Sequence, residues 1–218
     1  MARIGLLGGS FNPAHAAHRR ISLAVIRALA LDEVWWLVSP GNPLKLAAGM
    51  APLSARVASA RAMARRAPIR ATVIEAALGT RYTVDTVRAL VRRYPRHRFV
   101  WIMGADNLAD FARWRDWRGI ARALPIAVVT RPGYEGLARR GAAVGWLGRF
   151  ARPQGDAKRW TRWSVPALVP VKSVPDPMSA TARRVADPGW HRRPTSGALT
   201  DSVTYRALPH RTVSQEDR

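Results

Sequence analysis

Short apolar runs alternate with longer amphipathic segments along most of the chain. The apolar runs predict six buried strands, at residues 3–8, 33–39, 70–75, 98–103, 126–130 and 167–171. Segments with helical spacing lie between them, at 13–30, 52–67 and 83–93, with a pair of short helices within 106–123. This alternation predicts an α/β fold, a doubly wound and mainly parallel sheet with helices on both faces. Ligands in such sheets bind beyond the carboxyl ends of the strands, near the switch in strand order.

The first predicted strand runs into a glycine-rich turn with two histidines, Gly8-Gly9-Ser10-Phe11-Asn12-Pro13-Ala14-His15-Ala16-Ala17-His18. The glycines permit a tight turn and close approach of the backbone to a ligand, and the helix start offers N–H groups and a positive dipole end to an anion. His15 and His18 are three residues apart and share one helical face. Either histidine alone is equally well explained as a solvated or helix-capping imidazole. The combination indicates phosphate handling.

Length, composition and charge set bounds on the function. The chain has 218 residues, of which 48% are hydrophobic, so it can bury one substantial core. The net charge of +22 would attract nucleic acid, but the 36 Lys and Arg residues are spread through every segment and form no single stripe. The absence of cysteine excludes disulfides and thiolate metal sites. No long apolar span or signal-peptide layout is evident, which predicts a cytoplasmic protein with no membrane partner.

The glycine-histidine segment resembles the phosphate-binding signature of the nucleotidylyltransferase superfamily, Gly-x-Phe-[Asp/Asn]-Pro-x-His-x-Gly-His. A second superfamily element, a Ser/Thr-rich helix start closed by Arg, is similar to Met178-Ser179-Ala180-Thr181-Ala182-Arg183-Arg184. Four further segments resemble the nicotinate-nucleotide adenylyltransferase family: Ser39-Pro40-Gly41-Asn42-Pro43-Leu44-Lys45, Tyr82-Thr83-Val84-Asp85-Thr86, Gly104-Ala105-Asp106-Asn107-Leu108 and Arg131-Pro132-Gly133-Tyr134. The resemblance covers about residues 1 to 187 and implies a Rossmann-like fold.

The resemblance also implies a reaction, adenylyl transfer from ATP to nicotinic acid mononucleotide in NAD biosynthesis. The attacking phosphate is already anionic, so no general base is required. Catalysis then depends on positioning two anions and neutralising the charge that develops, with Mg²⁺ bridging ATP oxygens and no metal ligand from the protein. ATP and nicotinic acid mononucleotide are the expected partners, no specific nucleic acid is expected, and a homo-oligomer is left open.

Site residues follow from the resemblance, position by position. The catalytic group comprises His15, His18, Lys45 and Arg184, with His18 acting mainly on the α-phosphate. The residues expected to bind ATP are Gly8, Gly9, Ser10, Phe11, Gly104, Asp106, Ser179 and Thr181. The residues expected to bind the nicotinate nucleotide are Tyr82, Thr83, Trp114 and Arg131.

Ordinary structural roles compete with several of these assignments. Lys45 could be a solvated loop lysine, and Arg131 could simply end a strand. Thr83 and Ser179 are good N-caps, and Asp106 could be a cap as well as a ribose ligand.

Two assignments on the helices have further alternatives. Trp114 is the ring expected to stack on the pyridine, whereas Trp117 is expected in the core. Arg56, on the helix at 52–67, faces either the cleft or the solvent. The helix N-terminus at Thr83 favours an anionic nicotinate over a neutral nicotinamide.

The chain departs from the superfamily patterns at a few positions. Ala17 replaces a glycine where adenine approaches the helix, and Ala180 replaces a commonly hydroxylic residue. Arg183 stands at a usually apolar position, where it could disturb the seating of Arg184. Asn12 in place of Asp keeps an amide that can serve a turn.

Residues 1–188 are predicted to form one nucleotidylyltransferase domain, and 189–218 a disordered basic tail that could instead fold back over the site. Residues 135–163 are an insertion that could be a surface helix packed on the sheet, an oligomer contact or a mobile flap.

The sequence also allows two other functions. One is another adenylyltransferase, for example one acting on phosphopantetheine, which Tyr82–Thr86 and Trp114 argue against. The other is a basic nucleic-acid-binding protein derived from the enzyme.

Overall fold

The central sheet has six parallel strands. A computed structural model describes residues 1–41, 49–130, 141–173, 180–192 and 199–208. The strands are β1 (Arg3–Gly9), β2 (Glu33–Val38), β3 (Ile69–Thr72), β4 (Arg98–Gly104), β5 (Ile126–Thr130) and β6 (Leu168–Lys172). Their order is β3-β2-β1-β4-β5-β6, and every neighbouring pair is parallel. The predicted α/β fold is confirmed, and the order reverses between β1 and β4.

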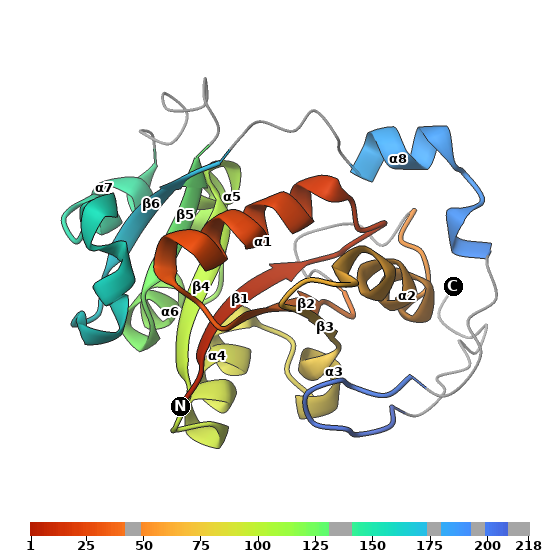
Figure 1. Ribbon diagram of the computed structural model, residues 1–218, viewed down its shortest axis with the longest axis horizontal. Helices are drawn as coiled ribbons and strands as arrows, with labels where there is room; N and C mark the ends of the chain where they lie inside the picture. Colours follow the sequence, from red (N-terminus) through yellow and green to blue (C-terminus); the bar gives the residue numbers. More distant parts are fainter. Residues whose placement is uncertain (42–48, 131–140, 174–179, 193–198, 209–218) are drawn as a thin grey trace.

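Helices cover both faces of this sheet (Figure 1). One face carries α1 (Ala16–Leu29), α2 (Leu53–Ala64) and the 3-10 segment η3 (Gln154–Arg162). The other face carries α3 (Ile74–Leu78), α4 (Thr83–Arg93), α5 (Ala105–Asp110), η1 (Phe111–Arg113), α6 (Trp117–Ala123) and α7 (Ala142–Gly148). The β2 sequence explains why both faces must be covered, because Trp36 is buried among the first set and Trp35 among the second.

The third strand ends earlier than its apolar run predicts. The strand was predicted to reach residue 75, but Ile74 already begins α3. That helix ends at Gly79, whose φ of 67° is a left-handed conformation that favours glycine. An apolar run buried in a strand and one buried in a short helix look alike in sequence.

The described part of the insertion wraps the β6 side of the sheet. Helix α7 buries Ala143 and Leu147 on the face of α4, whereas η3 buries Ala157 and Trp160 on the face of α1. The Trp160 indole Nε1 donates a hydrogen bond of 3.0 Å to the carbonyl of Leu29, at the end of α1. Residues 141–163 thus pack on the sheet, which is one of the three predicted alternatives for this insertion.

Residues 180–192 and 199–208, which follow β6, have defined structure. Helix α8 (Ala180–Ala186) and the 3-10 turn η4 (Trp190–Arg192) lie near the end of α2 (Figure 1). Residues 199–208 lie beside β3 and α3, where Ser202 Oγ donates 2.9 Å to the carbonyl of Ala71. The prediction of a disordered tail from residue 189 is therefore wrong for residues 189–192 and 199–208. Polar contacts to a distant strand fix the 199–208 segment, and such contacts leave no periodic pattern in the sequence.

None of the helices in the described ranges is long and apolar enough to span a bilayer.

Ser22 supports the packing between α1 and β2. Its side chain is fully buried, accepts a hydrogen bond of 2.8 Å from Trp36 Nε1 and donates 2.9 Å to the carbonyl of His18. Replacing Ser22→Ala leaves the buried indole N–H unpaired, so we expect a loss of about 1–3 kcal/mol in the free energy of unfolding, measured in urea. Ser164→Ala, at an exposed position, is the control and should change stability by less than about 0.5 kcal/mol. Equal stability of Ser22→Ala and wild type would contradict the assigned bond.

Candidate active site

The loop between β1 and α1 turns at Phe11. The tight turn was predicted at the two glycines, but both lie in β1, and Phe11 has the left-handed backbone, with φ of 48°. The glycines instead leave room for aromatic rings. A Cβ at Gly8 would lie 3.0 Å from the Trp101 ring, and one at Gly9 would lie 3.2 Å from the Phe11 ring. The Phe11 ring is 1% exposed and stacks on Trp36, 5.0 Å between centroids.

The two histidines lie against each other at the start of α1. Their ring centroids are 3.9 Å apart, and His15 is 8% exposed. The backbone N–H of His15 donates 3.2 Å to Nδ1 of His18. That bond requires Nδ1 to accept, so a neutral His18 carries its proton on Nε2. The Phe11 ring lies 4.7 Å from the His18 ring, so this residue, predicted to bind ATP, supports the histidine from the core.

Asn12 joins the histidine loop to two other segments. Its Nδ2 donates 2.9 Å to the carbonyl of Gly49, and its Oδ1 accepts 3.1 Å from the N–H of Ala51. Its own carbonyl accepts 2.7 Å from Nη1 of Arg184, whose Nη2 donates 3.1 Å to Thr181. The two superfamily elements therefore meet, although they are 172 residues apart. An aspartate at position 12 would have no N–H to donate to Gly49.

Arg56 is the site-forming residue that sequence reasoning did not resolve. It is neither on the cleft surface nor in solvent, because it is 1% exposed. Its guanidinium donates to four backbone carbonyls, those of Ser10 (2.8 Å), Ser39 (2.6 Å), Pro40 (3.3 Å) and Ala51 (2.9 Å). Burial lowers the pKa of Arg56 to about 10, so the group stays cationic at neutral pH. Among 36 basic residues, no local signal marks this one.

Strand β4, which neighbours β1, brings Gly104 and the following Asp106 to the same end of the sheet as the histidine loop. Leu7 of β1 lies opposite Ile102 of β4, so the two strands end side by side. A Cβ at Gly104 would collide with the carboxylate of Asp106, so glycine is needed for that carboxylate to lie where it does. Asp106 is exposed in the first turn of α5.

Residues predicted for the nicotinate nucleotide lie after β3 and after β4. Helix α4 begins at Thr83, so the N-cap is Tyr82 and the predicted capping role of Thr83 is wrong by one residue. The Arg115 guanidinium stacks over the Tyr82 ring, with its Cζ 4.5 Å from the ring centroid. Trp114 is half-buried, and its centroid is 6.1 Å from that of Trp101, the ring that fills the space at Gly8. Trp117, predicted in the core, is half-buried against Phe111 and Trp146.

Three predicted residues lie outside the described ranges: Lys45, Arg131 and Ser179.

Glu75 is a buried carboxyl between the two sides of the site. It is 8% exposed, and its backbone carbonyl accepts 2.9 Å from the N–H of Thr80. Burial raises the pKa of Glu75 to about 7, against the lowering effect of the nearby hydroxyls of Ser39 and Thr86. The Ser39 hydroxyl itself donates 2.9 Å to the carbonyl of Gly41, and the Ser39 carbonyl accepts 2.6 Å from Arg56.

The departures from the superfamily pattern are accommodated. Ala17 is 3% exposed, so the protein's own atoms cover its methyl. Arg183 lines a hollow of about 610 Å³ between α2 and α8, together with Arg65 and Trp190. Arg184 nevertheless reaches Asn12. Within the described ranges, no group of three or more His, Asp or Glu side chains could hold a metal ion.

Comparison with known proteins agrees with this geometry. A cytidylyltransferase-like family model matches residues 6–185. The "Probable nicotinate-nucleotide adenylyltransferase" of Erythrobacter litoralis (strain HTCC2594) is 61% identical over 206 residues, 94% of each chain. The chain belongs to the nicotinate-nucleotide adenylyltransferase family.

Other relatives of this family extend the comparison. A protein of the same name from Bradyrhizobium sp. (strain BTAi1) is 49% identical over 188 residues, 86% of this chain and 98% of that one. The solved structure of Plasmodium falciparum nicotinic acid mononucleotide adenylyltransferase complexed with NaAD shares the fold, with a TM-score of 0.63 at 15% identity over 85% of this chain and 83% of that one. The predicted family is confirmed, and so is the predicted Rossmann-like architecture.

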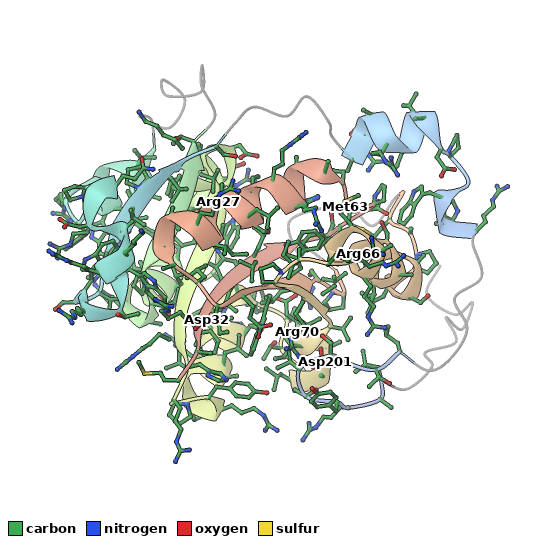
Figure 2. The ribbon with its side chains drawn as sticks, viewed as in Figure 1. Arg27, Asp32, Met63, Arg66, Arg70 and Asp201 are labelled. Atoms are coloured by element: carbon green, nitrogen blue, oxygen red, sulfur yellow. The ribbon has the colours of Figure 1, made fainter. Side chains whose placement is uncertain are left out.

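Replacing Arg56→Met removes the donors for four backbone carbonyls but keeps an unbranched side chain. We expect the free energy of unfolding to fall by about 2–4 kcal/mol, measured by urea denaturation, because four part-buried hydrogen bonds to a charged group are lost together. Arg27→Met, at an exposed position of α1 labelled in Figure 2, is the control, with an expected change below about 0.5 kcal/mol. Similar losses of stability in the two variants would show that the four hydrogen bonds of Arg56 contribute no more to stability than an exposed arginine does.

Glu75 predicts a pH dependence of stability. The pKa of Glu75 rises from 4.5 to about 7 on folding, so the folded protein binds more protons between these values, and stability falls as pH rises through that window. The full cost above pH 7 is about 3 kcal/mol at most. Glu75→Gln cannot titrate, so its stability relative to wild type should improve between pH 5 and pH 8. A difference that is constant across this range would show that Glu75 does not titrate there.

Proposed function

We propose that this protein transfers the adenylyl group of ATP to nicotinic acid mononucleotide. An oxygen of the mononucleotide phosphate bonds to the α-phosphorus of ATP, and the bond from that phosphorus to pyrophosphate breaks. The products are nicotinic acid adenine dinucleotide and pyrophosphate. The observation that carries this proposal is the bond from Arg184 to Asn12, which brings the second phosphate element of the family onto the histidine loop.

Charge neutralisation accounts for the rate in this proposal. The Nε2–H of His18 donates to an oxygen of the α-phosphate, and His15 supports the adjacent phosphates. Arg184 offers a planar fork of donors to the triphosphate, and Lys45 adds a further positive charge. Mg²⁺ bound together with ATP would screen the charge of the phosphates that these residues hold.

The two nucleotides bind at separate places beyond the carboxyl ends of the strands. Gly8, Gly9 and Ser10 border the ATP phosphates. Asp106, beside Gly104, accepts hydrogen bonds from the ribose hydroxyls of ATP. Thr181 and Ser179 also bind ATP. Tyr82, Thr83, Trp114 and Arg131 bind the nicotinate nucleotide. The positive end of the α4 dipole favours its carboxylate over the amide of nicotinamide mononucleotide.

Pyrophosphate release by the purified protein with ATP and Mg²⁺ tests the reaction. We expect turnover with nicotinic acid mononucleotide and, since one charge interaction is lost, at least roughly tenfold lower kcat/KM with the amide. His18→Ala should reduce kcat/KM by about 10²–10³, the usual effect of removing one donor to a developing charge.

His97→Ala is the matched control, because His97 lies directly before β4, at the amino ends of the strands and opposite to the proposed site. Per folded protein, its kcat/KM should equal that of wild type. A His18→Ala protein with full activity would contradict the role of His18. Turnover with phosphopantetheine in place of the mononucleotide would overturn the substrate assignment, and salt-dependent DNA binding without any turnover would overturn the proposed reaction.

A further inference from the structure

We propose that residues 199–208 position the nicotinate-nucleotide side of the site by holding both ends of α3, with Asp201 as the main contact. This inference rests on the proposed function for its effect on catalysis. It assigns a role to a segment that lies beyond the 6–185 match to the family model.

Asp201 is the most strongly bound side chain of this segment. It is fully buried, and its Oδ1 accepts from Thr72 Oγ1 and from the N–H of Val73 at 2.9 Å. Its Oδ2 accepts from Val203 N–H (3.2 Å) and from Thr204 N–H and Oγ1 (2.7 Å each). Burial by itself raises the pKa of Asp201, but the hydrogen bonds outweigh it and hold the pKa below its usual value. The group is therefore an ionised carboxylate with five donors.

The segment lies along β3, the edge strand of the sheet. Arg70 Nη1 donates 3.1 Å to the carbonyl of Ser202, and Thr200 and Ala207 form an antiparallel bridge that closes the segment on itself. Figure 2 shows Asp201 and Arg70 close together at this edge, and Figure 1 shows the segment passing beside α3. The segment thus has a defined place next to the strand that leads into α3.

Both ends of α3 are bound to the segment. At the start, Asp201 binds the N–H of Val73, the N-cap of α3, and Thr72 Oγ1 accepts 3.0 Å from the N–H of Ile74. At the end, Arg206 Nη1 donates 3.4 Å to the carbonyl of Ala77. A helix of five residues has little stability of its own, so these contacts determine where it lies.

From α3, hydrogen bonds continue to the start of α4. The carbonyl of Glu75 in α3 accepts 2.9 Å from the N–H of Thr80, whose Oγ1 lies 2.8 Å from Thr86 Oγ1. Thr86 Oγ1 donates 3.3 Å to the carbonyl of Tyr82. Tyr82 and Thr83 are the residues proposed to meet the nicotinate carboxylate. The phosphate loop, by contrast, is held by Arg56 and Asn12. Loosening the 199–208 segment should therefore affect the nicotinate nucleotide more than ATP.

Asp201→Asn in the full-length protein tests this selectivity. The amide keeps the shape but turns one acceptor into a donor facing N–H or hydroxyl groups. We expect KM for nicotinic acid mononucleotide to rise by roughly fivefold to twentyfold, while KM for ATP and kcat change by less than about threefold. Arg206→Met, which releases the other end of α3, should likewise raise KM for nicotinic acid mononucleotide more than KM for ATP, and it decides the matter if Asp201→Asn does not fold.

Asp32→Asn is the control for a merely structural loss. Asp32 is an exposed carboxylate that accepts 2.6 Å from the N–H of Arg3, at the start of β1 and away from the site, as labelled in Figure 2. This variant should leave both KM values unchanged. Equal rises of both KM values in Asp201→Asn, or no rise in folded protein, would overturn the proposal.

Amide hydrogen exchange separates this inference from the proposed function. A wild-type protein without turnover on the mononucleotide would overturn the function but leave the positioning role to be decided by exchange rates. Asp201→Asn should speed exchange at residues 74–86 by more than tenfold and leave residues 15–29 near the wild-type rate. Uniform acceleration, or none, would overturn the positioning role.

Discussion

The convergence of four backbone carbonyls on one buried guanidinium is the interaction on which the site depends. Arg56 binds the phosphate loop at Ser10, the end of β2 at Ser39 and Pro40, and the approach to α2 at Ala51. Taking a cation out of water is costly, and the carbonyls offset that cost only when all three segments are in place. The same charge lies behind a loop proposed to bind anions, where it adds to the attraction for phosphate.

Two sets of contacts hold the two halves of the site. Arg56 and Asn12 organise the phosphate side, and Asn12 also receives Arg184 from the far end of the chain. The 199–208 segment, acting through α3, organises the start of α4. Ser39 belongs to the first set, because its carbonyl accepts 2.6 Å from Arg56. A site for two anionic nucleotides is thereby assembled from elements at both ends of the chain.

The buried groups also explain why charge composition says little about the reaction. The net charge of +22 describes the surface and its attraction for anions. The described site is organised by a single buried arginine, by an amide that both donates and accepts, and by Glu75, whose raised pKa of about 7 reflects its burial. None of these properties follows from a count of basic residues.

The sequence by itself determined the sheet, most of the helices and the family. Burial of a strand between two helical layers leaves a continuous apolar run, as in Val34–Val38, and a phosphate loop has fixed spacing, so both are local signals. Only the tertiary structure decided the turn at Phe11, the burial of Arg56, the early end of β3 and the order of residues 199–208. Each of these depends on partners distant in sequence, such as Trp36 for Phe11 and Thr72 for Asp201. A hydrogen bond or ring contact between distant segments leaves no periodicity, so the chain must fold before such a residue has a role.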